Sequence, residues 1–268
     1  MQVFRILLCT ALLAPATLQA QVVQKSDEAA AGELPSRWSL GLAAAVRQSA
    51  YAGEDRRSMV FPNVIYEGER FFWHGGAAGY HLTKRDGFVL DGFVAARMDG
   101  IDADDFGVRE LAQRGVDRRL LDDRDDSADA GFAATWKGAA GELELDVRAD
   151  VTGTSEGYQT SAHYRYPFRF GATTITPSIG ARSLSADMAD YYYGTLDEEI
   201  ARGVVRYRPG SVVVPDAGVT LVTAFARKWL FIAGIEYRAL PDELKDSPLV
   251  ELDADHTATF VIGFSRGF

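Results

Sequence analysis

The side chains best placed to do chemistry are the charged residues of segment 141–151, where every second residue is charged. These residues are Glu142, Glu144, Asp146, Arg148 and Asp150. Carboxylates spaced in this way can bind a cation, select cations in a pore, or form ion pairs with arginines. What lies on the opposite face of the segment decides between these uses.

His163 is the histidine with the best claim to a catalytic role, because Ser161 and Arg165 would share its face of a strand. A hydrolase needs a nucleophile, a base and an orienting group at one place. No recognisable nucleophile motif accompanies His163, so we interpret it as a polar lining residue. The other histidines lack the spacing of metal ligands. The sequence therefore predicts no catalytic residue, no metal site and no cofactor, and a protein that is not an enzyme.

Apolar residues occupy the positions between the charges of segment 141–151, and this period of two predicts a strand with one apolar face. Similar alternation occurs in segments 38–47, 88–98, 132–137, 158–170, 229–238 and 256–268. We expect an all-β fold with roughly ten to twelve strands, and an even number favours about twelve.

The connections between these strands alternate in length. Segments 85–87, 138–141 and 227–228 are short, whereas 99–129, 190–211 and 241–253 are long. Aromatic residues also fall near strand ends on the apolar face, namely Trp38, Trp136, Tyr158, Phe168, Trp229, Tyr237 and Phe268. Both regularities are typical of outer-membrane barrels. We therefore predict a closed antiparallel transmembrane β-barrel of about 12 strands, since an open sheet edge in hydrocarbon leaves backbone groups unpaired.

The polar face of such a barrel points into its lumen. The predicted lumen-lining residues are Asp91, Arg97, Glu142, Glu144, Asp146, Arg148, Asp150, His163, Arg165, Arg169, Arg182, Glu236 and Arg238. They could form a structural ion-pair network or line a permeation path. We favour the network, because side chains largely fill the interior of a barrel of modest strand number.

Two features of the long segments have alternative explanations. The run Tyr191, Tyr192 and Tyr193 could be a contact surface for a partner, or could pack over the barrel mouth. The aspartate-rich segment 102–126 lacks the ligand spacing and glycine of a calcium loop, so we interpret it as a solvated loop. A short helix is expected over 111–121.

Residues 1–20 look like a secretory signal peptide, with Arg5, an apolar core over 6–13 and small residues before a cleavage site. We expect residues 21–36 to be a flexible periplasmic lead-in and 37–268 to form the barrel. Cys9, the only cysteine, lies in the leader, so the mature chain can form no disulfide. The formal net charge of −10 disfavours nucleic acid as a partner.

Several short motifs give the chain a family resemblance. They are 51–53 (Tyr-Ala-Gly), 61–64 (Phe-Pro-Asn-Val) followed by Tyr66, 70–72 (Arg-Phe-Phe), 191–194 (Tyr-Tyr-Tyr-Gly) and 247–250 (Ser-Pro-Leu-Val), with the terminal Phe268. In this order and spacing, over residues 34–268, the chain resembles the MltA-interacting protein (MipA)/OmpV family. Arg266 departs from the apolar residue that many outer-membrane barrels have near the C-terminus.

The resemblance implies a barrel in the outer membrane of the bacterial cell. Some members of the family are described as scaffolds that join a lytic transglycosylase to a penicillin-binding protein, and others as porin-like or adhesive. We therefore expect a non-enzymatic scaffold for murein-remodelling enzymes, with a narrow porin-like channel for small solutes, or an adhesin, as the alternatives. The expected partners are outer-membrane lipid and lipopolysaccharide, together with a periplasmic murein hydrolase and synthase.

Overall fold

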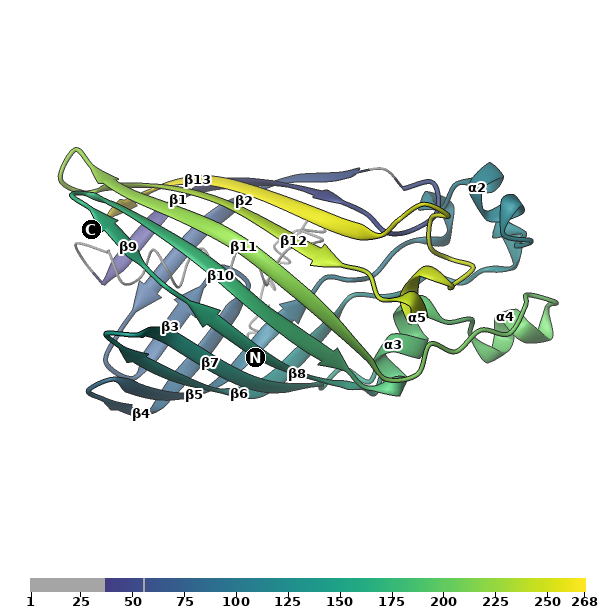
Figure 1. Ribbon diagram of the computed structural model, residues 1–268, viewed down its shortest axis with the longest axis horizontal. Coiled ribbons are helices and arrows are strands. Elements are labelled where there is room, and N and C mark those ends of the chain that lie inside the picture. The colour runs from purple at the N-terminus through teal and green to yellow at the C-terminus, as the bar shows by residue number, and fades with distance from the viewer. Residues whose placement is uncertain (1–36, 55) are drawn as a thin grey trace, which may run out of the picture.

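The computed structural model describes residues 37–54 and 56–268 (Figure 1). The predicted signal peptide and lead-in lie outside the described residues. The described strands are β1 (Trp38–Gln48), β2 (Arg56–Glu67), β3 (Phe71–His74), β4 (Ala77–Arg85), β5 (Phe88–Arg97), β6 (Ser127–Gly138), β7 (Gly141–Asp150), β8 (Tyr158–Arg165), β9 (Phe168–Phe170), β10 (Thr173–Leu184), β11 (Val212–Phe225), β12 (Trp229–Ala239) and β13 (His256–Gly267).

All of these strands belong to one antiparallel sheet that closes on itself. β13 pairs with β1, and β10 pairs with β11, so the order of strands returns to its start. β8 and β9 both pair with β10, and the N–H of Tyr166 between them donates to the carbonyl of Pro177. They are therefore two parts of one barrel strand, and the predicted closed barrel of 12 strands is confirmed. The expected continuous strand over 158–170 is interrupted because Pro167 has no N–H to donate.

The apolar side chains lie on the outer face of the sheet and the charged side chains lie inside the barrel, the reverse of a water-soluble protein. In β7, Leu143, Leu145 and Val147 are 42–45% exposed, whereas Asp146 and Arg148 on the other face are 7% and 8% exposed. The aromatic residues predicted near strand ends are exposed on the outer face as expected: Trp38, Trp136, Tyr158, Phe168, Trp229, Tyr237 and Phe268. An outer wall of this composition suits lipid, and a polar interior suits ion pairs or water.

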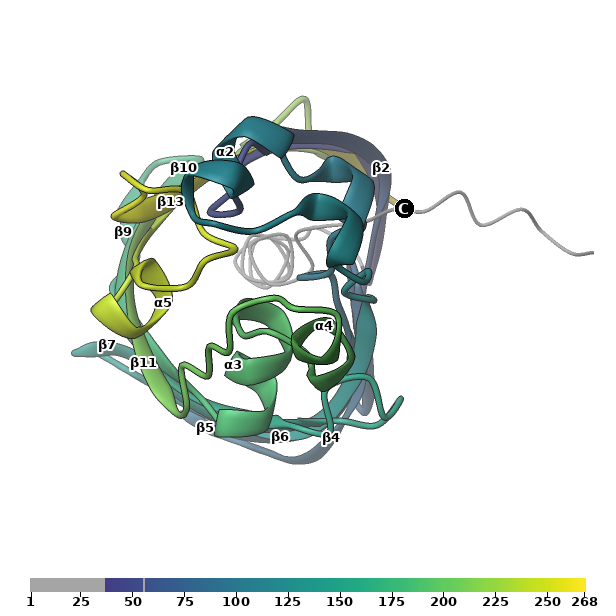
Figure 2. The ribbon, with the colours of Figure 1, turned by 90° about the vertical axis from the view of Figure 1, so that its right-hand side faces the viewer.

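The two ends of the barrel differ, as the alternating connections predicted. Tight turns join the strands at the end where the chain terminates, which we call the inner end (Figure 1). One of them is the predicted turn at Asp86 and Gly87, where Gly87 has a φ of +75°. The opposite, outer end has the long connections, and their helices lie across the mouth (Figure 2). No described helix is both apolar and long enough to span a membrane.

The long connections contain short helices that pack together as a cap on the outer end. We use "cap" for residues 98–126, 185–211 and 240–255. Its helical segments are η1 (Ala103–Asp105), α2 (Val108–Gln113), η2 (Arg118–Leu120), α3 (Ala186–Tyr193), α4 (Asp197–Ala201) and α5 (Asp242–Lys245). The single helix expected over 111–121 is wrong. Gly115 takes a φ of +76° after α2, and Asp117 caps the separate turn η2 by accepting from the N–H of Arg119.

The cap has an apolar core, so the interpretation of 102–126 as a solvated loop is also wrong. Phe106 and Leu111 of this segment are almost fully buried. They pack with Tyr51 and with Leu249, which come from two other connections. A second buried cluster surrounds α3 and includes Met188, Tyr192, Leu244 and Val250. Spaced apolar residues inside an acidic segment therefore form a lid that rests on the barrel.

The barrel wall is shortest at the β3–β4 hairpin. β2 pairs with β1 from Arg56 to Tyr66, but it pairs with β3 only from Ile65 to Glu67. The N–H of Glu67 donates toward β1, so the even-numbered residues of β2 direct their backbone groups toward β3. The carbonyl of Val64 accepts from the N–H of Gly75. From there to the outer end of β2, no described strand pairs with the side of β2 that faces β3. Pro62 lies in this stretch, where its missing N–H costs no ladder bond.

Candidate functional site

A buried ion-pair group centred on Arg97 crosses the lumen below the cap. From β5, the Arg97 guanidinium donates to Asp129 on β6 through Nη2 at 2.7 Å and to Asp99 through Nη1 at 3.0 Å. Asp99 also accepts from Arg47 on β1 at 3.2 Å. Arg97 reaches Gln159 on β8 as well, at 3.1 Å. The Arg97 guanidinium thus connects β5, β6 and β8 directly, and Asp99 extends the group to β1.

A second ion-pair group lies among β8 and β10–β12. Oε1 of Glu236 accepts from Nε of Arg238 at 2.5 Å and from Nη2 of Arg182 at 3.4 Å. The same Arg182 nitrogen is 3.7 Å from Oδ2 of Asp216. Nε2 of His163 lies 3.1 Å from that oxygen. Acidic and basic side chains therefore alternate across the strands, so that each buried charge has a partner.

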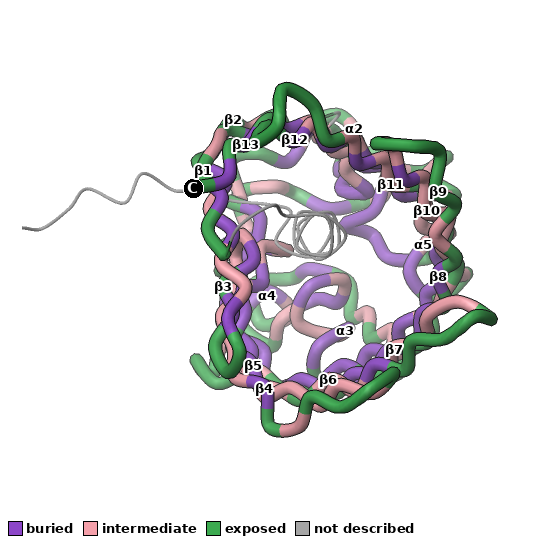
Figure 3. The backbone as a smooth tube through the Cα atoms, turned by 90° about the vertical axis from the view of Figure 1, so that its left-hand side faces the viewer, coloured by how far each residue is buried: buried purple, intermediate pink, exposed green. Residues whose placement is uncertain are grey.

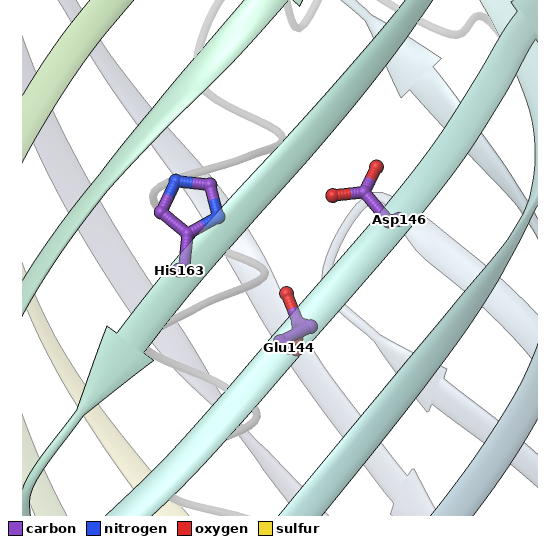
Figure 4. Close-up of side chains that lie close together, drawn as sticks. All are labelled: Glu144, Asp146 and His163. Carbon is purple, nitrogen blue, oxygen red and sulfur yellow. The ribbon is translucent and has the colours of Figure 1, made fainter.

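Glu144, Asp146 and His163 bring three potential metal-ligating side chains together (Figure 4). One ligand atom from each lies within 4.8 Å of the other two. Both carboxylates already face an arginine, because Asp146 accepts from Nε of Arg148 at 2.9 Å and Glu144 pairs with Arg165. A cation would have to displace these guanidinium groups. The arrangement therefore favours an ion-pair network over a metal site.

The order of Ser161, His163 and Asp216 resembles that of a hydrolase triad. Ser161 Oγ lies 3.4 Å from Nδ1 of His163, whose Nε2 is 3.1 Å from Asp216. The Ser161 hydroxyl, however, donates to Asp146. Its proton is thus directed away from the histidine that would have to accept it, and all of these side chains are buried. The geometry supports charge pairing more than acyl transfer.

Four predicted lumen residues lie outside these groups, namely Asp91, Glu142, Asp150 and Arg169; the first two line the inner cavity described below. Asp150, at the end of β7, accepts from the backbone N–H of Thr152 at 2.8 Å and of Ser155 at 2.6 Å. It organises the β7–β8 connection and is not part of the network, which corrects the prediction. Arg169 on β9 is exposed at the inner end, where it borders the inner cavity.

An inner cavity of about 410 Å³ occupies the lumen toward the inner end. Residues next to the tight turns line it, including Lys84, Lys137 and Glu142. Deeper in, it reaches Asp91 and the network residues Glu144, Asp146, Arg148 and Arg165. Figure 3 views the barrel from this end. We use "ion-pair layer" for the two buried ion-pair groups around Arg97 and Glu236. This layer lies between the inner cavity and the cap.

Two histidines that appear scattered in the sequence meet at this cavity. His74 on β3 and His81 on β4 both face inward, and Glu67 of β2 lies 3.1 Å from Nε2 of His74 and 3.2 Å from Nε2 of His81. Nδ1 of His81 lies 2.6 Å from Asp91 on β5. Phe72 stacks against His74 with ring centroids 4.9 Å apart. The hairpin pairing creates this cluster, which the spacing along the chain does not indicate.

At the outer end, the cap is fastened by a fully buried ion pair between Arg124 and Glu199. Both side chains are 0% exposed, and the contacts are 2.8 Å from Nη1 to Oε1 and 2.9 Å from Nη2 to Oε2. Arg124 also donates to the carbonyls of Tyr191 and Gly194, while Glu199 accepts from the N–H of Leu196. This pair joins the β5–β6 and β10–β11 connections.

The three consecutive tyrosines belong to this cap. Tyr192 is 1% exposed, and Tyr191 and Tyr193 are half-buried. Burial raises the pKa of Tyr192 well above its ordinary value, with the Asp99 carboxylate adding to the shift. The alternative in which the run packs over the mouth is the one observed, and Tyr192 is not available as a contact surface.

Three motifs that carry the family resemblance converge in the cap. The ring of Tyr51 stacks on that of Tyr193 with centroids 5.8 Å apart, and its hydroxyl donates to the carbonyl of Tyr192. Tyr51 also forms a β-bridge with Val250. Ser247 donates to the carbonyl of Tyr193 at 2.6 Å. These motifs therefore specify how the connections pack, not a catalytic centre.

Several residues that complete the network give no recognisable signal in the sequence. Asp129 and Asp216 lie at the outer ends of β6 and β11, in stretches assigned to a loop or left outside a strand. The alternation continues there through alanine, serine and proline, which give little hydrophobic signal. Asp99, Arg124 and Glu199 lie in connections, where no periodic pattern indicates which charges become buried.

Acidification is expected to loosen the cap through Asp99. Burial alone would raise the pKa of its carboxyl, but Arg47 and Arg97 lower it well below the ordinary value of 3.8. A lowered pKa contributes stability above the unfolded pKa, and this stability is lost as the pH falls through the folded pKa. We therefore expect the urea concentration at the unfolding midpoint to decrease once the pH is lowered below about 4. The urea midpoint of Asp99→Asn should fall less than that of the wild type as the pH is lowered. If the two midpoints depended equally on pH, Asp99 would not be the group responsible.

Comparisons with known proteins place this chain among outer-membrane proteins. The family model described as "MltA-interacting protein MipA" matches residues 40–268. The putative outer membrane protein YiaT of Escherichia coli K12 is 27% identical over 237 residues, which cover 87% of this chain and 92% of that protein. The MltA-interacting protein of the same strain is 28% identical over 218 residues, covering 80% and 84%.

Solved structures of outer-membrane channels also align with the chain. The NanC porin covers 85% of this chain and 100% of its own, at 9% identity and a TM-score of 0.48. An outer-membrane channel from Pseudomonas putida F1 covers 88% of this chain and 97% of its own, at 10% identity and a TM-score of 0.43.

Proposed function

Because this chain belongs to the MltA-interacting protein MipA family, we propose that it is a non-enzymatic scaffold that holds murein-remodelling enzymes at the outer membrane. Its outer-membrane location is shared with its relatives, and tight turns are typical of the periplasmic end of such barrels. The inner end would then face the murein layer. The proposed partners are a lytic transglycosylase and a penicillin-binding protein.

The cap packed across the outer mouth is the observation that carries this proposal. A porin needs a continuous water-filled path, and here the cap and the ion-pair layer lie between the inner cavity and the outside. The Arg124–Glu199 pair fixes two of the cap connections together. A barrel covered by a packed cap on its outer side but hollow on its inner side suits a protein whose partners are periplasmic.

The lumen chemistry also favours a non-enzymatic role. The carboxylates with catalytic potential, such as Glu144 and Asp146, are engaged by arginines, and the Ser161 hydroxyl donates to Asp146. An active site keeps such groups directed at a substrate position. These groups instead face one another, which stabilises the barrel interior.

Affinity capture tests the proposal directly. We expect the detergent-solubilised barrel to retain a lytic transglycosylase from an envelope extract of its own bacterium, identified by mass spectrometry. The control is an unrelated outer-membrane barrel of similar size on the same resin. Capture of no murein enzyme, together with a steady open current in planar bilayers, would support the porin alternative and contradict the scaffold.

A further inference from the structure

Charge is distributed very unevenly between the two ends of the barrel. The outer connections 49–55, 98–126, 151–157, 185–211 and 240–255 hold 24 acidic and nine basic residues. We define the inner rim as residue 37 with residues 67–70, 84–87, 137–142, 168–173, 225–229 and 265–268. This rim holds nine basic and four acidic residues, in a chain with a net charge of −10. The two ends hold equal numbers of basic residues, but only the inner rim, which would face the periplasm, has a net positive charge.

Several of the rim cations are not neutralised by neighbours. Lys84 pairs with Glu67, and Lys137 lies 3.6 Å from Glu142. Five others are exposed and make no ion pair within the described part of the chain, namely Arg70, Arg85, Arg227, Lys228 and Arg266. The rim therefore presents a net positive surface to the solvent.

The position of these cations around the mouth limits what they can bind. Arg85 lies at the β4–β5 turn and Lys228 at the β11–β12 turn, which are opposite each other in the closed order of strands. A single small anion could not contact both. An extended polyanion could cross the mouth and contact cations on several turns.

The composition of the turns favours a polymer over a folded protein. The turns contain small residues such as Gly87, Ala139 and Ala140, whereas large apolar side chains near this end, such as Trp136 and Trp229, are exposed on the outer wall. Protein interfaces depend on buried aromatic or aliphatic anchors. Dispersed cations without such anchors are the pattern by which proteins hold polyanions.

We propose that the inner rim binds murein directly, through its exposed basic residues and the carboxylates of the murein stem peptides. This inference rests on the proposed function, which places the barrel beside murein enzymes. Contact with the polymer would keep a captured enzyme next to its substrate. The rim cations act here as dispersed charges, so the binding is electrostatic and falls with ionic strength.

Co-sedimentation with murein sacculi tests the proposal. The sacculi are boiled in detergent to strip proteins, and the full barrel is held in a non-ionic detergent without lipid. We expect the wild-type barrel to sediment with the sacculi at low salt and to be released as NaCl rises. Arg85→Glu combined with Lys228→Glu should bind at least about tenfold more weakly, since each cation near an anionic surface contributes about 1 kcal/mol.

A matched control keeps the net charge change equal. Arg109→Glu combined with Arg206→Glu alters two exposed cap arginines, and it should sediment like the wild type. Unchanged migration in semi-native electrophoresis shows that each variant remains folded. Equal sedimentation of both double variants would overturn the proposal, as would a wild-type barrel that stays in solution.

Other occupants of the rim give different results. If the rim variant loses binding to phosphatidylglycerol vesicles but keeps binding to sacculi, the rim recognises lipid headgroups and the proposal fails. If only sacculi that retain their proteins bind the barrel, the ligand is a protein and the proposal also fails. A barrel that captures a transglycosylase but ignores stripped sacculi overturns this inference alone. Sedimentation without enzyme capture overturns the scaffold instead.

Discussion

Replacing Glu199 with alanine is expected to unfasten the cap and open the outer mouth. The substitution would leave the Arg124 guanidinium, which is 0% exposed, without its carboxylate partner. Removing one partner of a buried pair costs about 3–5 kcal/mol, because the remaining charge is neither paired nor hydrated. The N–H groups of Leu196 and Asp122 would lose their acceptors as well. We therefore expect the β5–β6 and β10–β11 connections to separate.

Two measurements follow this opening. Protease added outside intact cells or proteoliposomes should cut the cap of Glu199→Ala much faster than that of the wild type. In planar bilayers the variant should pass more current, because the cap would no longer cover the inner cavity. Arg119→Ala is the matched control, since its pair with Asp117 is exposed and exposed pairs contribute little. Wild-type protease resistance in Glu199→Ala would show that the pair does not hold the cap.

Replacing Leu145 with arginine is expected to destabilise the barrel in lipid by about 2–4 kcal/mol, the cost of an arginine near the bilayer midplane. Leu145 lies midway along β7 on the outer face and is 43% exposed. Val151, just beyond the same strand, is 59% exposed. Val151→Arg should cost only about 0–1 kcal/mol, because its side chain would reach the interface.

Urea unfolding from phospholipid vesicles, followed by tryptophan fluorescence, measures both changes. The difference between Leu145→Arg and Val151→Arg is the informative quantity, since the two variants carry the same added charge. If both cost the same, the outer face of β7 would not contact hydrocarbon, and the membrane-spanning assignment would be wrong.

The fold was predictable because its main determinant is local. A strand between lipid and lumen must alternate apolar and polar residues, and the alternation along β7 reports that environment residue by residue. Turn chemistry at Asp86 and Gly87 and the contrast between short and long connections are also local features. The pairing of both β8 and β9 with β10 could not be predicted, because it depends on the register of β10 on either side of Pro167.

The site was less predictable because its contacts join strands that are distant in sequence. Glu144 and Arg165 could be assigned to a polar face, but their pairing depends on the register between β7 and β8. His74 and His81 meet only because the β3–β4 hairpin folds back on itself. The cap was misjudged for a different reason. Its acidic composition hides spaced apolar residues such as Phe106, which become buried once three connections assemble.

The low wall at β3 has a consequence for the surrounding bilayer. Val60 is 74% exposed on the outer face of β2, within the stretch whose edge no described strand meets. Backbone groups left unpaired in hydrocarbon cost several kcal/mol each, whereas hydrated ones cost little. Water and headgroups must therefore descend along this flank, and the leaflet there must be thinner than elsewhere around the protein.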